Sequence, residues 1–370
     1  MVFLDVVFYA FTVVVFIQVI FYIFFFGKFA FLKPIKKRPN NIEVSVIVCA
    51  KNEAENLKNF LPSIISQDYT SFEIVLINDA SHDDTLEVME AFSEKHSNIK
   101  IVDVKNTEAF WANKKYALTL GIKASKHNYL LFTDADCKPV SKYWISEMSS
   151  HFSNEKSIVL GYGAYSKIKK SFLNKLIRFE TLTTAIHYFS FANLGLPYMG
   201  VGRNLAYTKN EFFKANGFVS HIKVRSGDDD LFINQIASKT NTAICISNEG
   251  FTESIPETTF KNWFNQKRRH ISTANYYKLK HKISLAVIYI TNLLFWFFAF
   301  ILLVTLHYWP IVVALLLLKI IVQFTVIGAS CKKLNEKDLL LLIPFLEIFL
   351  IVFQLAIFIN NLISKPNHWK

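Results

Sequence analysis

An apolar stretch at residues 2–26 constrains this chain more than any other feature. It contains one charged residue, Asp5, and consists otherwise almost entirely of Val, Phe, Ile and Tyr. A helix needs about 20 apolar residues to cross the hydrocarbon core of a bilayer. A cleaved signal peptide would have a shorter apolar region, with positive charge in front of it. Here the positive charges follow, so we expect a retained transmembrane anchor over residues 1–27.

Three more apolar stretches follow near the other end of the chain, at residues 283–305, 311–330 and 339–363. The last two are interrupted by polar residues or proline, at Lys319, Gln323, Pro344 and Glu347. Such imperfect spans either lie at the membrane interface or pack their polar residues inward. We therefore assign residues 283–370 to a C-terminal membrane region with two to three transmembrane helices.

Basic residues predict the orientation of the region between these membrane segments. The linker at residues 28–41 carries five positive charges and no acid, and a second basic cluster, Lys267 to Lys282, precedes the next apolar stretch. Positive flanks stay on the cytoplasmic side, so residues 42–282 should face the cytosol. The net charge of +12 is largely explained by these flanks. Basic belts that face anionic lipid account for it without a nucleic-acid partner.

The first half of residues 42–282 alternates short apolar runs with amphipathic stretches. Strands are predicted at residues 43–50, 72–79, 99–104 and 129–136, and helices at residues 52–67, 83–96 and 114–125. This alternation predicts an α/β domain with a mostly parallel sheet that is covered by helices on both faces. The four cysteines show no CxxC spacing, so neither a disulfide framework nor a thiolate metal site is indicated.

Polar side chains gather where the predicted strands end. In open α/β sheets, ligands bind beyond the carboxyl ends of the strands. The residues at these ends are Asn52 and Glu53 after the first strand, Asn78 and Asp79 at the second, and Asp134 and Asp136 at the fourth. Neither GxGxxG nor GxxxxGK[ST] follows the first strand, which argues against a dinucleotide dehydrogenase and a P-loop NTPase.

The segment YLLFTDADCKPV, residues 129–140, places two carboxylates at positions i and i+2. In an extended chain Asp134 and Asp136 point the same way, and they repel each other unless a positive charge lies between them. A hard divalent cation binds such oxygens and can bridge to the phosphates of a substrate. The alternative is an acidic turn before Pro139.

The order of these segments resembles the family 2 inverting glycosyltransferases. The resemblance rests on VSVIVCAKNEAENL, FEIVLINDASHDDT, NKKYALTLGI and YLLFTDADCKPV, and then on VGRNLAYTKNEFFKANGF, GDDDLFINQIA and QKRRH. It covers residues 42–282. It implies a GT-A glycosyltransferase domain, with a Rossmann-like, mostly parallel sheet that binds a nucleotide sugar, flanked by N- and C-terminal transmembrane helices. It also implies a divalent metal, Mg²⁺ or Mn²⁺.

The resemblance implies a role for each matching residue. The donor-binding positions are matched by Asn52, Glu53, Asp79, Lys114, Asp134, Gln266 and Arg269. Asp134 and Asp136 match the metal site. Asp229 matches the general base, with Asp228 beside it, although the triple acid 228–230 leaves this register open by one residue. The same acids would also suit the N-terminus of a helix, and both roles are compatible.

Several positions depart from the family pattern. Asn78 replaces the first acid of a pair, and Asn113 and Thr119 replace Gly and Asn in the lysine segment. His270 replaces Trp, which weakens the case for processive synthesis of a long polymer.

The expected function is that of an inverting, metal-dependent hexosyltransferase in a bacterial inner membrane, with its catalytic domain in the cytoplasm. Its expected partners are a nucleotide-sugar donor, a lipid-linked or membrane-proximal glycan acceptor, and membrane lipids. A UDP-sugar is the favoured donor. One alternative is a processive polysaccharide synthase that exports its product through its own helices. The other is a non-catalytic membrane scaffold that kept the fold. The apolar residues 171–200 either lie against the bilayer and admit the acceptor or form a core helix.

Overall fold

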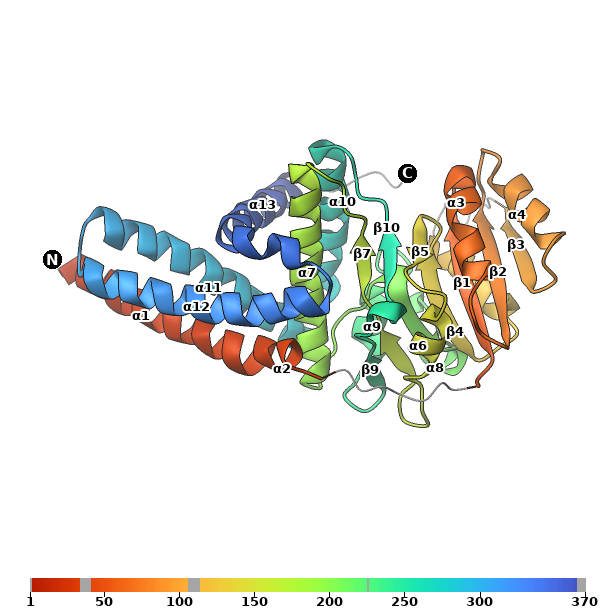
Figure 1. The fold of residues 1–370 in the computed structure, drawn as a ribbon, viewed down its shortest axis with the longest axis horizontal. Coiled ribbons are helices and arrows are strands. Elements are labelled where there is room, and N and C mark those ends of the chain that lie inside the picture. The colour runs from red at the N-terminus through yellow and green to blue at the C-terminus, as the bar shows by residue number, and fades with distance from the viewer. Residues whose placement is uncertain (1, 34–40, 106–113, 225, 365–370) are drawn as a thin grey trace. The chain divides into compact units, whose positions relative to one another are not determined.

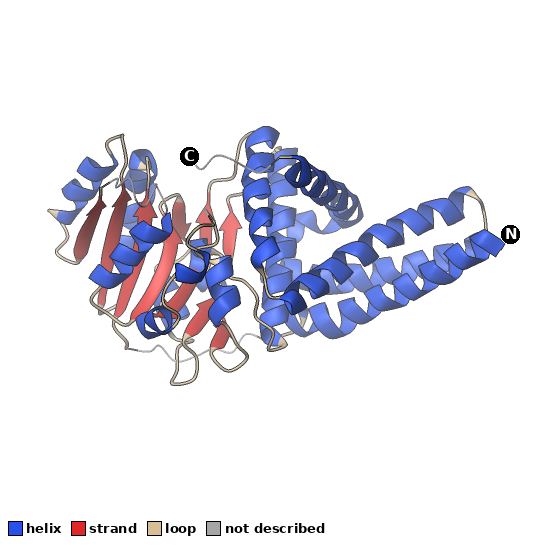
Figure 2. Cartoon of the chain, turned by 180° about the vertical axis from the view of Figure 1, so that it is seen from behind, coloured by secondary structure: helices blue, strands red, loops and turns tan. Residues whose placement is uncertain are grey.

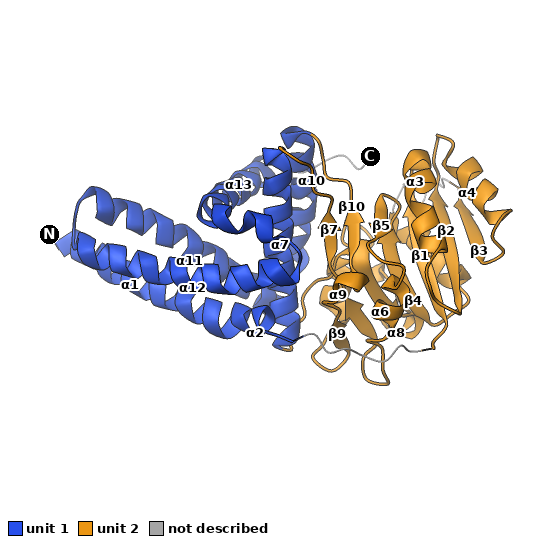
Figure 3. Ribbon diagram, in the orientation of Figure 1, with its two compact units in different colours: residues 1–33, 171–194, 259–367 blue, residues 34–170, 195–258, 368–370 orange. Residues whose placement is uncertain are grey.

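The computed structural model describes residues 2–33, 41–105, 114–224 and 226–364 (Figure 1). The described strands all belong to one part of the fold, and the longest helices belong to another (Figure 2). These parts form two compact units (Figure 3). The helical unit lies within residues 1–33, 171–194 and 259–367, and the α/β unit within residues 34–170 and 195–258. Residues 171–194 and 259–282, which we expected in the α/β domain, thus cluster with the apolar helices.

The α/β unit is built on a seven-stranded sheet in the order β3-β2-β1-β4-β8-β6-β9. Its strands are β1 (Val44–Ala50), β2 (Phe72–Asp79), β3 (Ile99–Val104), β4 (Tyr129–Asp134), β6 (Ile158–Leu160), β8 (Leu205–Thr208) and β9 (Thr242–Ile244). Strands β3, β2, β1 and β4 pair in parallel, whereas β8 runs antiparallel to β4 and β6. The predicted mostly parallel sheet is therefore confirmed. The fourth predicted strand ends at Asp134, two residues earlier than expected.

Helices cover both faces of this sheet, because the central strands carry apolar side chains on both faces. The helices of the unit are α3 (Ala54–Ile65), α4 (Thr85–Ser93), α5 (Lys114–Ala124), α6 (Trp144–Ser149), α8 (Lys209–Lys214) and α9 (Asp230–Ile236). Val46 and its neighbours at alternate positions of β1 pack against Leu57 and Leu61 of α3. On the other face, a Cβ added to Gly121 of α5 would lie 2.1 Å from Ile77 Cδ1. Only glycine allows this close approach of helix and sheet.

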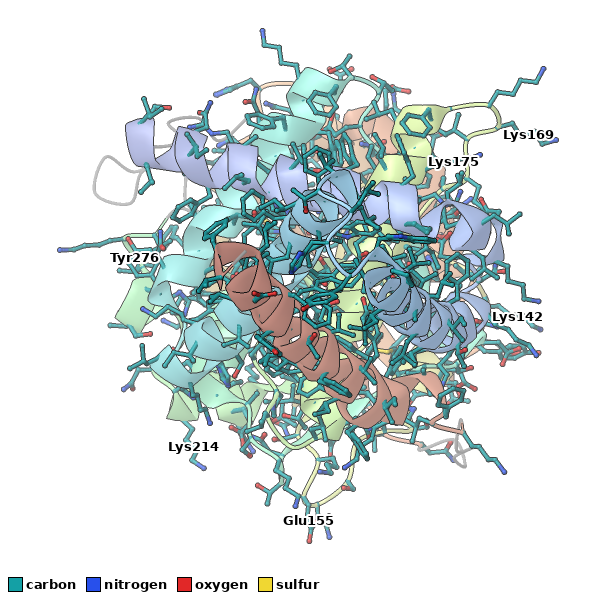
Figure 4. The ribbon with its side chains drawn as sticks, turned by 90° about the vertical axis from the view of Figure 1, so that its left-hand side faces the viewer. Lys142, Glu155, Lys169, Lys175, Lys214 and Tyr276 are labelled. Carbon is teal, nitrogen blue, oxygen red and sulfur yellow. The ribbon has the colours of Figure 1, made fainter. Side chains whose placement is uncertain are left out.

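A second, three-stranded sheet extends the loop after β4. Its order is β5-β10-β7, with β5 (Cys137–Pro139), β10 (Thr252–Ser254) and β7 (Gly163–Tyr165). Short 3-10 turns complete the unit at η3 (Gly202–Asn204), η4 (Val219–His221) and η5 (Asn248–Gly250). Charged side chains such as Lys142, Glu155 and Lys214 extend from its exterior (Figure 4).

The helical unit contains four segments that are long and apolar enough to cross a membrane, namely Val2–Ala30, Leu279–Val304, Trp309–Lys333 and Lys337–Ile363. They are formed by α1 (Val2–Ile20), η1 (Phe21–Phe26), α2 (Gly27–Ala30), α11 (Leu279–Val304), α12 (Trp309–Lys333), η7 (Lys337–Leu342) and α13 (Ile343–Ile363). Helix α1 packs on α11, where Phe11 stacks on Phe295 with ring centroids 5.7 Å apart.

The polar residues that interrupt the last two apolar stretches meet inside the helical unit. Lys319 Nζ donates to Glu347 Oε2 (2.7 Å) and to Gln323 Oε1 (2.9 Å), while Gln323 Nε2 donates to Glu347 Oε1 (2.7 Å). Lys319 and Gln323 are fully buried. The two imperfect stretches thus pack their polar residues inward. Each polar group forms hydrogen bonds with another, away from the apolar surface.

Two further helices, α7 (Phe172–Asn193) and α10 (Phe260–Thr273), belong to the helical unit. The turn η6 (Ala274–Tyr276) follows α10. Arg178 of α7 is buried and donates through Nε to Glu336 (2.9 Å) and through Nη1 to Asp338 (2.9 Å). Trp263 of α10 stacks on Phe353 of α13, with ring centroids 4.2 Å apart. Helix α7 is therefore a packed helix, and its expected contact with the bilayer surface stays a prediction.

Candidate active site

The loops after β1 and β2 are tied together by hydrogen bonds. The Asn52 N–H donates to Ser81 Oγ (3.0 Å), and the His82 N–H donates to Asn52 Oδ1 (2.8 Å). Asn52 and Ala80 both have positive φ, at 55° and 49°. Left-handed backbone outside glycine costs of order 1–3 kcal/mol and clusters at binding sites. Asn52 thus shapes the loop where the donor is expected, and its contact with the donor stays a prediction.

Glu53 and Asp79 lie at the carboxyl ends of the same two strands. The Glu53 carboxylate accepts a hydrogen bond from Asn56 Nδ2, within the first turn of α3. Asp79 ends β2 and is 4% exposed. Burial raises the pKa of Asp79, and the positive charges of Lys51 and Lys114 oppose that shift. The predicted donor acids therefore lie where the strand ends were expected to place them.

Asp134, Asp136 and Cys137 form a candidate metal centre. One ligand atom from each lies within 4.8 Å of the others. Burial, and then the charge of Asp134, raise the pKa of Asp136 to about 6. A cation between the two carboxylates would relieve this repulsion.

The donor set itself favours a hard cation. Cys137 Sγ donates to Asp136 Oδ1 (3.3 Å), and burial raises the pKa of this thiol well above its ordinary value. The two carboxylates supply the oxygen ligands of this cluster. Oxygen ligands suit Mg²⁺ or Mn²⁺, so the residues present fit the expected ion.

Lys114, the first residue of α5, joins the two acidic clusters. Its Nζ lies 2.8 Å from Asp134 Oδ1 and 3.2 Å from Asp228 Oδ2. Burial opposes the charge of Lys114, but Asp134 and Asp228 outweigh it and hold the pKa of the lysine well above its ordinary value. In return, the lysine holds the pKa of Asp134 below its usual range in spite of burial. The neighbouring Lys115 points elsewhere and donates to the carbonyls of His221 and Val224.

The three acids before α9 have three different environments. Asp228 pairs with Lys114, and Asp230 Oδ1 accepts from the Leu231 N–H (2.7 Å). Asp229 is the N-cap of α9, and its two oxygens accept from the N–H groups of Asp230 and Gly202, both at 2.7 Å. Burial, and then the charges of Asp228 and Asp230, raise the pKa of Asp229 to about 7. Asp229 is thus the acid with the basicity of a general base near neutral pH.

The turn η3 adds two residues that we did not predict, Gly202 and Arg203. Asn204 holds the turn in place, because its buried amide accepts from Trp144 Nε1 (3.0 Å) and donates to the Gly250 carbonyl (2.7 Å). Gly202 then orients Asp229 through its N–H. The signal in the sequence was a cation between Gly and Asn in the quoted VGRN segment.

Arg203 brings a second cation to the metal centre. Its guanidinium lies over the Tyr165 ring, 4.2 Å from the centroid, and Nη1 donates to Ser254 Oγ (2.9 Å). The charge of Arg203 lowers the pKa values of Asp134 and Asp136, although for each acid burial has the larger, opposite effect. These two contacts fix the planar group, so Arg203 is a candidate for holding a phosphate near the ion.

A cavity of about 20 Å³ lies among these groups and is lined by residues of β1, α5, β4, η3 and the loop before α9. They include Cys49, Lys114, Thr133, Asp134, Gly202, Asp228 and Asp229. This volume suits little more than one water, so the residues form the floor of a site rather than an enclosed sugar pocket. The buried Thr133 Oγ1 lines the cavity and finds no hydrogen-bond partner among the described residues. It is therefore available to a bound water or ligand.

Gln266 and Arg269 belong to α10 of the helical unit, whereas the residues described above belong to the α/β unit. Their spacing of three residues places both on one face of the helix. Gln266 Oε1 is buried and has no hydrogen-bond partner among the described residues. The role of both residues at the diphosphate stays a prediction. Asn113, named above as a departure from the family pattern, lies outside the described residues.

Comparison with known proteins shows which family the α/β unit is similar to. The model of the family "Glycosyl transferase family 2" matches residues 45–217, which include both strand-end loops, Lys114, the metal centre and η3. The glycosyltransferase AglE of Haloferax volcanii is 29% identical over 46% of this chain and 52% of its own length. The Escherichia coli enzyme WfaP, a UDP-Glc:α-D-GlcNAc-diphosphoundecaprenol β-1,3-glucosyltransferase, is 28% identical over 35% of this chain and 48% of its own length. The chain thus spans about half the length of these relatives.

A solved structure extends the likeness to the fold. The mannosyltransferase PcManGT of Pyrobaculum calidifontis, in complex with GDP-Man and Mn²⁺, aligns with a TM-score of 0.58 over 90% of this chain and 99% of its own. At 17% sequence identity, this alignment speaks for the fold alone. The family model thus identifies residues 45–217 as a glycosyltransferase family 2 domain, and this alignment together with the mostly parallel sheet identifies its fold as GT-A.

Proposed function

We propose that this protein is an inverting glycosyltransferase. It transfers a sugar from a nucleoside-diphosphate sugar to a lipid-linked or membrane-proximal glycan acceptor on the cytoplasmic face of the membrane. The observation that carries the proposal is the acid–lysine–acid arrangement, in which Lys114 bridges the metal centre at Asp134 to the acids before α9. The family match over residues 45–217 supports it. The four apolar segments support a membrane-proximal acceptor.

The proposed reaction is a direct displacement at the anomeric carbon. The acceptor hydroxyl is a poor nucleophile, and Asp229 takes its proton as the new glycosidic bond forms. A pKa of about 7 makes this carboxylate more basic than an ordinary acid and leaves a substantial fraction of it ionised near neutral pH. The Gly202 N–H keeps the carboxylate oriented during the attack.

The bond between the anomeric carbon and the diphosphate breaks in the same step, and the leaving oxygen gains negative charge. A divalent cation held by Asp134 and Asp136 would stabilise that charge. Lys114 and Arg203 add two fixed positive charges beside the same carboxylates. Preorganised charges of this kind contribute to catalysis because they need no rearrangement when the bond breaks.

The test is a donor screen with the full chain in membrane vesicles. UDP- and GDP-sugars are offered with Mg²⁺ or Mn²⁺ and a membrane lipid extract, and release of the nucleoside diphosphate is measured. We expect one donor to release its nucleotide in a metal- and extract-dependent way, with an inverted anomeric configuration in the product. Absence of release from every donor by the folded protein would contradict the proposal and favour a non-catalytic scaffold. A polymeric product would favour the processive alternative.

A further inference from the structure

The helical unit contains a cavity of about 400 Å³ that the reaction above does not use. It is lined by residues of η1, α7, α10, η6, α11, α12 and α13, all within one unit. Ligand pockets in proteins range over roughly 300–1,000 Å³, whereas a single water needs only about 10–15 Å³. The cavity is therefore large enough for part of an organic molecule.

The wall of this cavity suits hydrocarbon. It presents Phe26, Phe179, Ile186, Leu285, Ile327 and Leu350. Two hydroxyls on the wall bond to backbone carbonyls, since Tyr289 Oη donates to the Ile351 carbonyl (3.1 Å) and Thr183 Oγ1 donates to the Phe179 carbonyl (2.9 Å). Glu347 likewise accepts from Lys319, Gln323, Trp296 and Tyr22. Apolar cavities of this kind stay free of water.

The one histidine on the wall adds no charge. The His187 ring stacks on Phe26 with centroids 5.1 Å apart. Burial lowers the pKa of His187 to about 4, so the ring is neutral at cellular pH. Lys319 and Glu347 compensate each other as an ion pair. The interior is thus neutral, and it suits a hydrocarbon tail better than a charged head group.

The rim of the cavity lies on helices that can face lipid. Phe358 is 58% exposed, and Ala286 is exposed as well. Both belong to segments long and apolar enough to cross a membrane. A hydrocarbon chain in the bilayer can therefore enter from the side.

A basic helix lies at the same end of the unit. Helix α10 packs beside α13 (Figure 1), and Arg268 Nε donates to Asn361 Oδ1 (2.9 Å), one turn beyond Phe358. Arg268 and Arg269 of α10 carry positive charge, whereas the adjacent Lys267 is buried and paired with Glu180 of α7. Ile271 and Ala274, just after them, line the cavity. The cavity thus combines a neutral apolar interior with positive charge beside its rim. This is the complement of a lipid with an anionic head and a long tail.

We propose that the cavity binds the hydrocarbon tail of the lipid that carries the acceptor, with the phosphate of that lipid beside the basic segment of α10. The inference rests on the proposed function, because it names the acceptor as a phosphate-bearing lipid. It assigns a tail site to the helical unit and leaves the chemistry to the α/β unit.

The test uses the full chain in phosphatidylcholine vesicles with two photoreactive probes of equal tail length, an alkyl phosphate and a phosphatidylcholine, each with a diazirine in the tail. We expect the alkyl phosphate to label cavity residues of α7 and α11 in preference to the phosphatidylcholine. Ala286→Phe, which narrows the rim, should lower labelling at least about tenfold, because one added group in an apolar pocket has effects of that size. Val287→Phe is the matched control, since Val287 is the next residue on α11 and does not line the cavity.

Thr183→Phe on α7 fills the cavity from another helix and serves as a second variant if Ala286→Phe does not fold. Equal labelling by both probes, or unchanged labelling in the folded cavity variants, would overturn the inference. Labelling needs no sugar donor, so it can succeed where the proposed transferase activity fails, and the reverse. In the transfer assay, Ala286→Phe should raise KM for a lipid-linked acceptor and leave metal-dependent donor binding unchanged.

Discussion

Lys114 Nζ lies 3.2 Å from Asp228 Oδ2, and this contact joins two segments that are more than 100 residues apart. The same lysine bonds to Asp134, so a single side chain neutralises one acid of the metal centre and one acid before α9. This arrangement distinguishes the acids. Asp228 has a fixed partner, whereas the donors to Asp229 among the described residues are backbone N–H groups, and its pKa is raised to about 7.

Lys114→Met should lower kcat by about 10²–10³, the loss typical of removing one preorganised charge from a reaction site. The substitution also leaves Asp134 and Asp228 without their shared cation, so donor binding should weaken too. Both effects can be read from initial rates over a range of donor concentrations. Lys123→Met, on the exposed side of the same helix, is the control and should retain the wild-type rate. Equal rates for the two variants would show that Lys114 has no part in the reaction.

Asp229→Asn should spare metal-dependent donor binding and lower the transfer rate by about 10²–10⁴, the usual contribution of a general base. Asp228→Asn should act mainly through Lys114, and so change donor affinity as well. Nucleotide binding by calorimetry and single-turnover transfer separate the two effects. Full transfer activity in Asp229→Asn would move the base to Asp228 or Asp230.

The rate of transfer should depend on the protonation of Asp229. The pKa of this acid is raised to about 7, and the carboxylate is the active form, so the rate should fall about tenfold per pH unit below pH 7 and level off above it. Because the folded state holds this proton more tightly than the unfolded chain, the same group favours folding at pH 5 and loses that contribution as the pH rises through 7. Thermal unfolding at pH 5 and pH 8 should therefore differ less in Asp229→Asn than in the wild type.

Asp136→Ala should abolish metal-dependent donor binding, because it removes half of the oxygen pair at the metal centre. Loss of a group that merely supports a metal ligand costs about 10–100-fold in affinity, so loss of a ligand should cost at least that much. Titration of the nucleotide in the presence of Mn²⁺ measures the effect. Glu155→Ala removes an exposed acid of the same unit and should bind like the wild type (Figure 4). Unchanged affinity in Asp136→Ala would assign the pair to a turn instead.

Arg203→Lys should raise KM for the donor about tenfold although it keeps the charge. The guanidinium is held flat over Tyr165 and bonds to Ser254, and an ammonium group cannot reproduce both contacts. Arg203→Ala should have a larger effect on KM than Arg203→Lys. If lysine supports wild-type kinetics, charge alone is needed at this position.

Glu347→Ala should destabilise the helical unit by about 3–5 kcal/mol, because it leaves Lys319 buried without its counterion. The double variant Glu347→Ala with Lys319→Met removes both charges and should recover much of this loss. Unfolding in detergent micelles, followed by tryptophan fluorescence, compares the single and double variants. Equal destabilisation of both would show that the pair contributes through packing rather than charge.

Local patterns in the sequence were sufficient to predict the order of elements. Each strand and helix up to Asp134 was predicted within a few residues, because period and turn residues are local signals. The polar residues at the strand ends were also predictable, because the carboxyl ends of parallel strands share one edge of the sheet. The apolar stretches predicted, by length and composition, the helices that are long and apolar enough to cross a membrane.

Contacts between distant segments could only be seen in the tertiary structure. The sequence matched Asp229 to the general base but left the register open by one residue, and the pairing of Asp228 with Lys114 distinguishes the two acids in the structure. In the sequence Arg203 is only a cation between Gly and Asn, and its electrostatic effect on Asp134 and Asp136 depends on where the turn η3 is placed. The polar residues that weakened two apolar stretches become a buried cluster once α12 and α13 pack together. Each of these relationships depends on the position of one side chain relative to a distant element. The periodicity of the sequence predicts local elements and cannot predict that position.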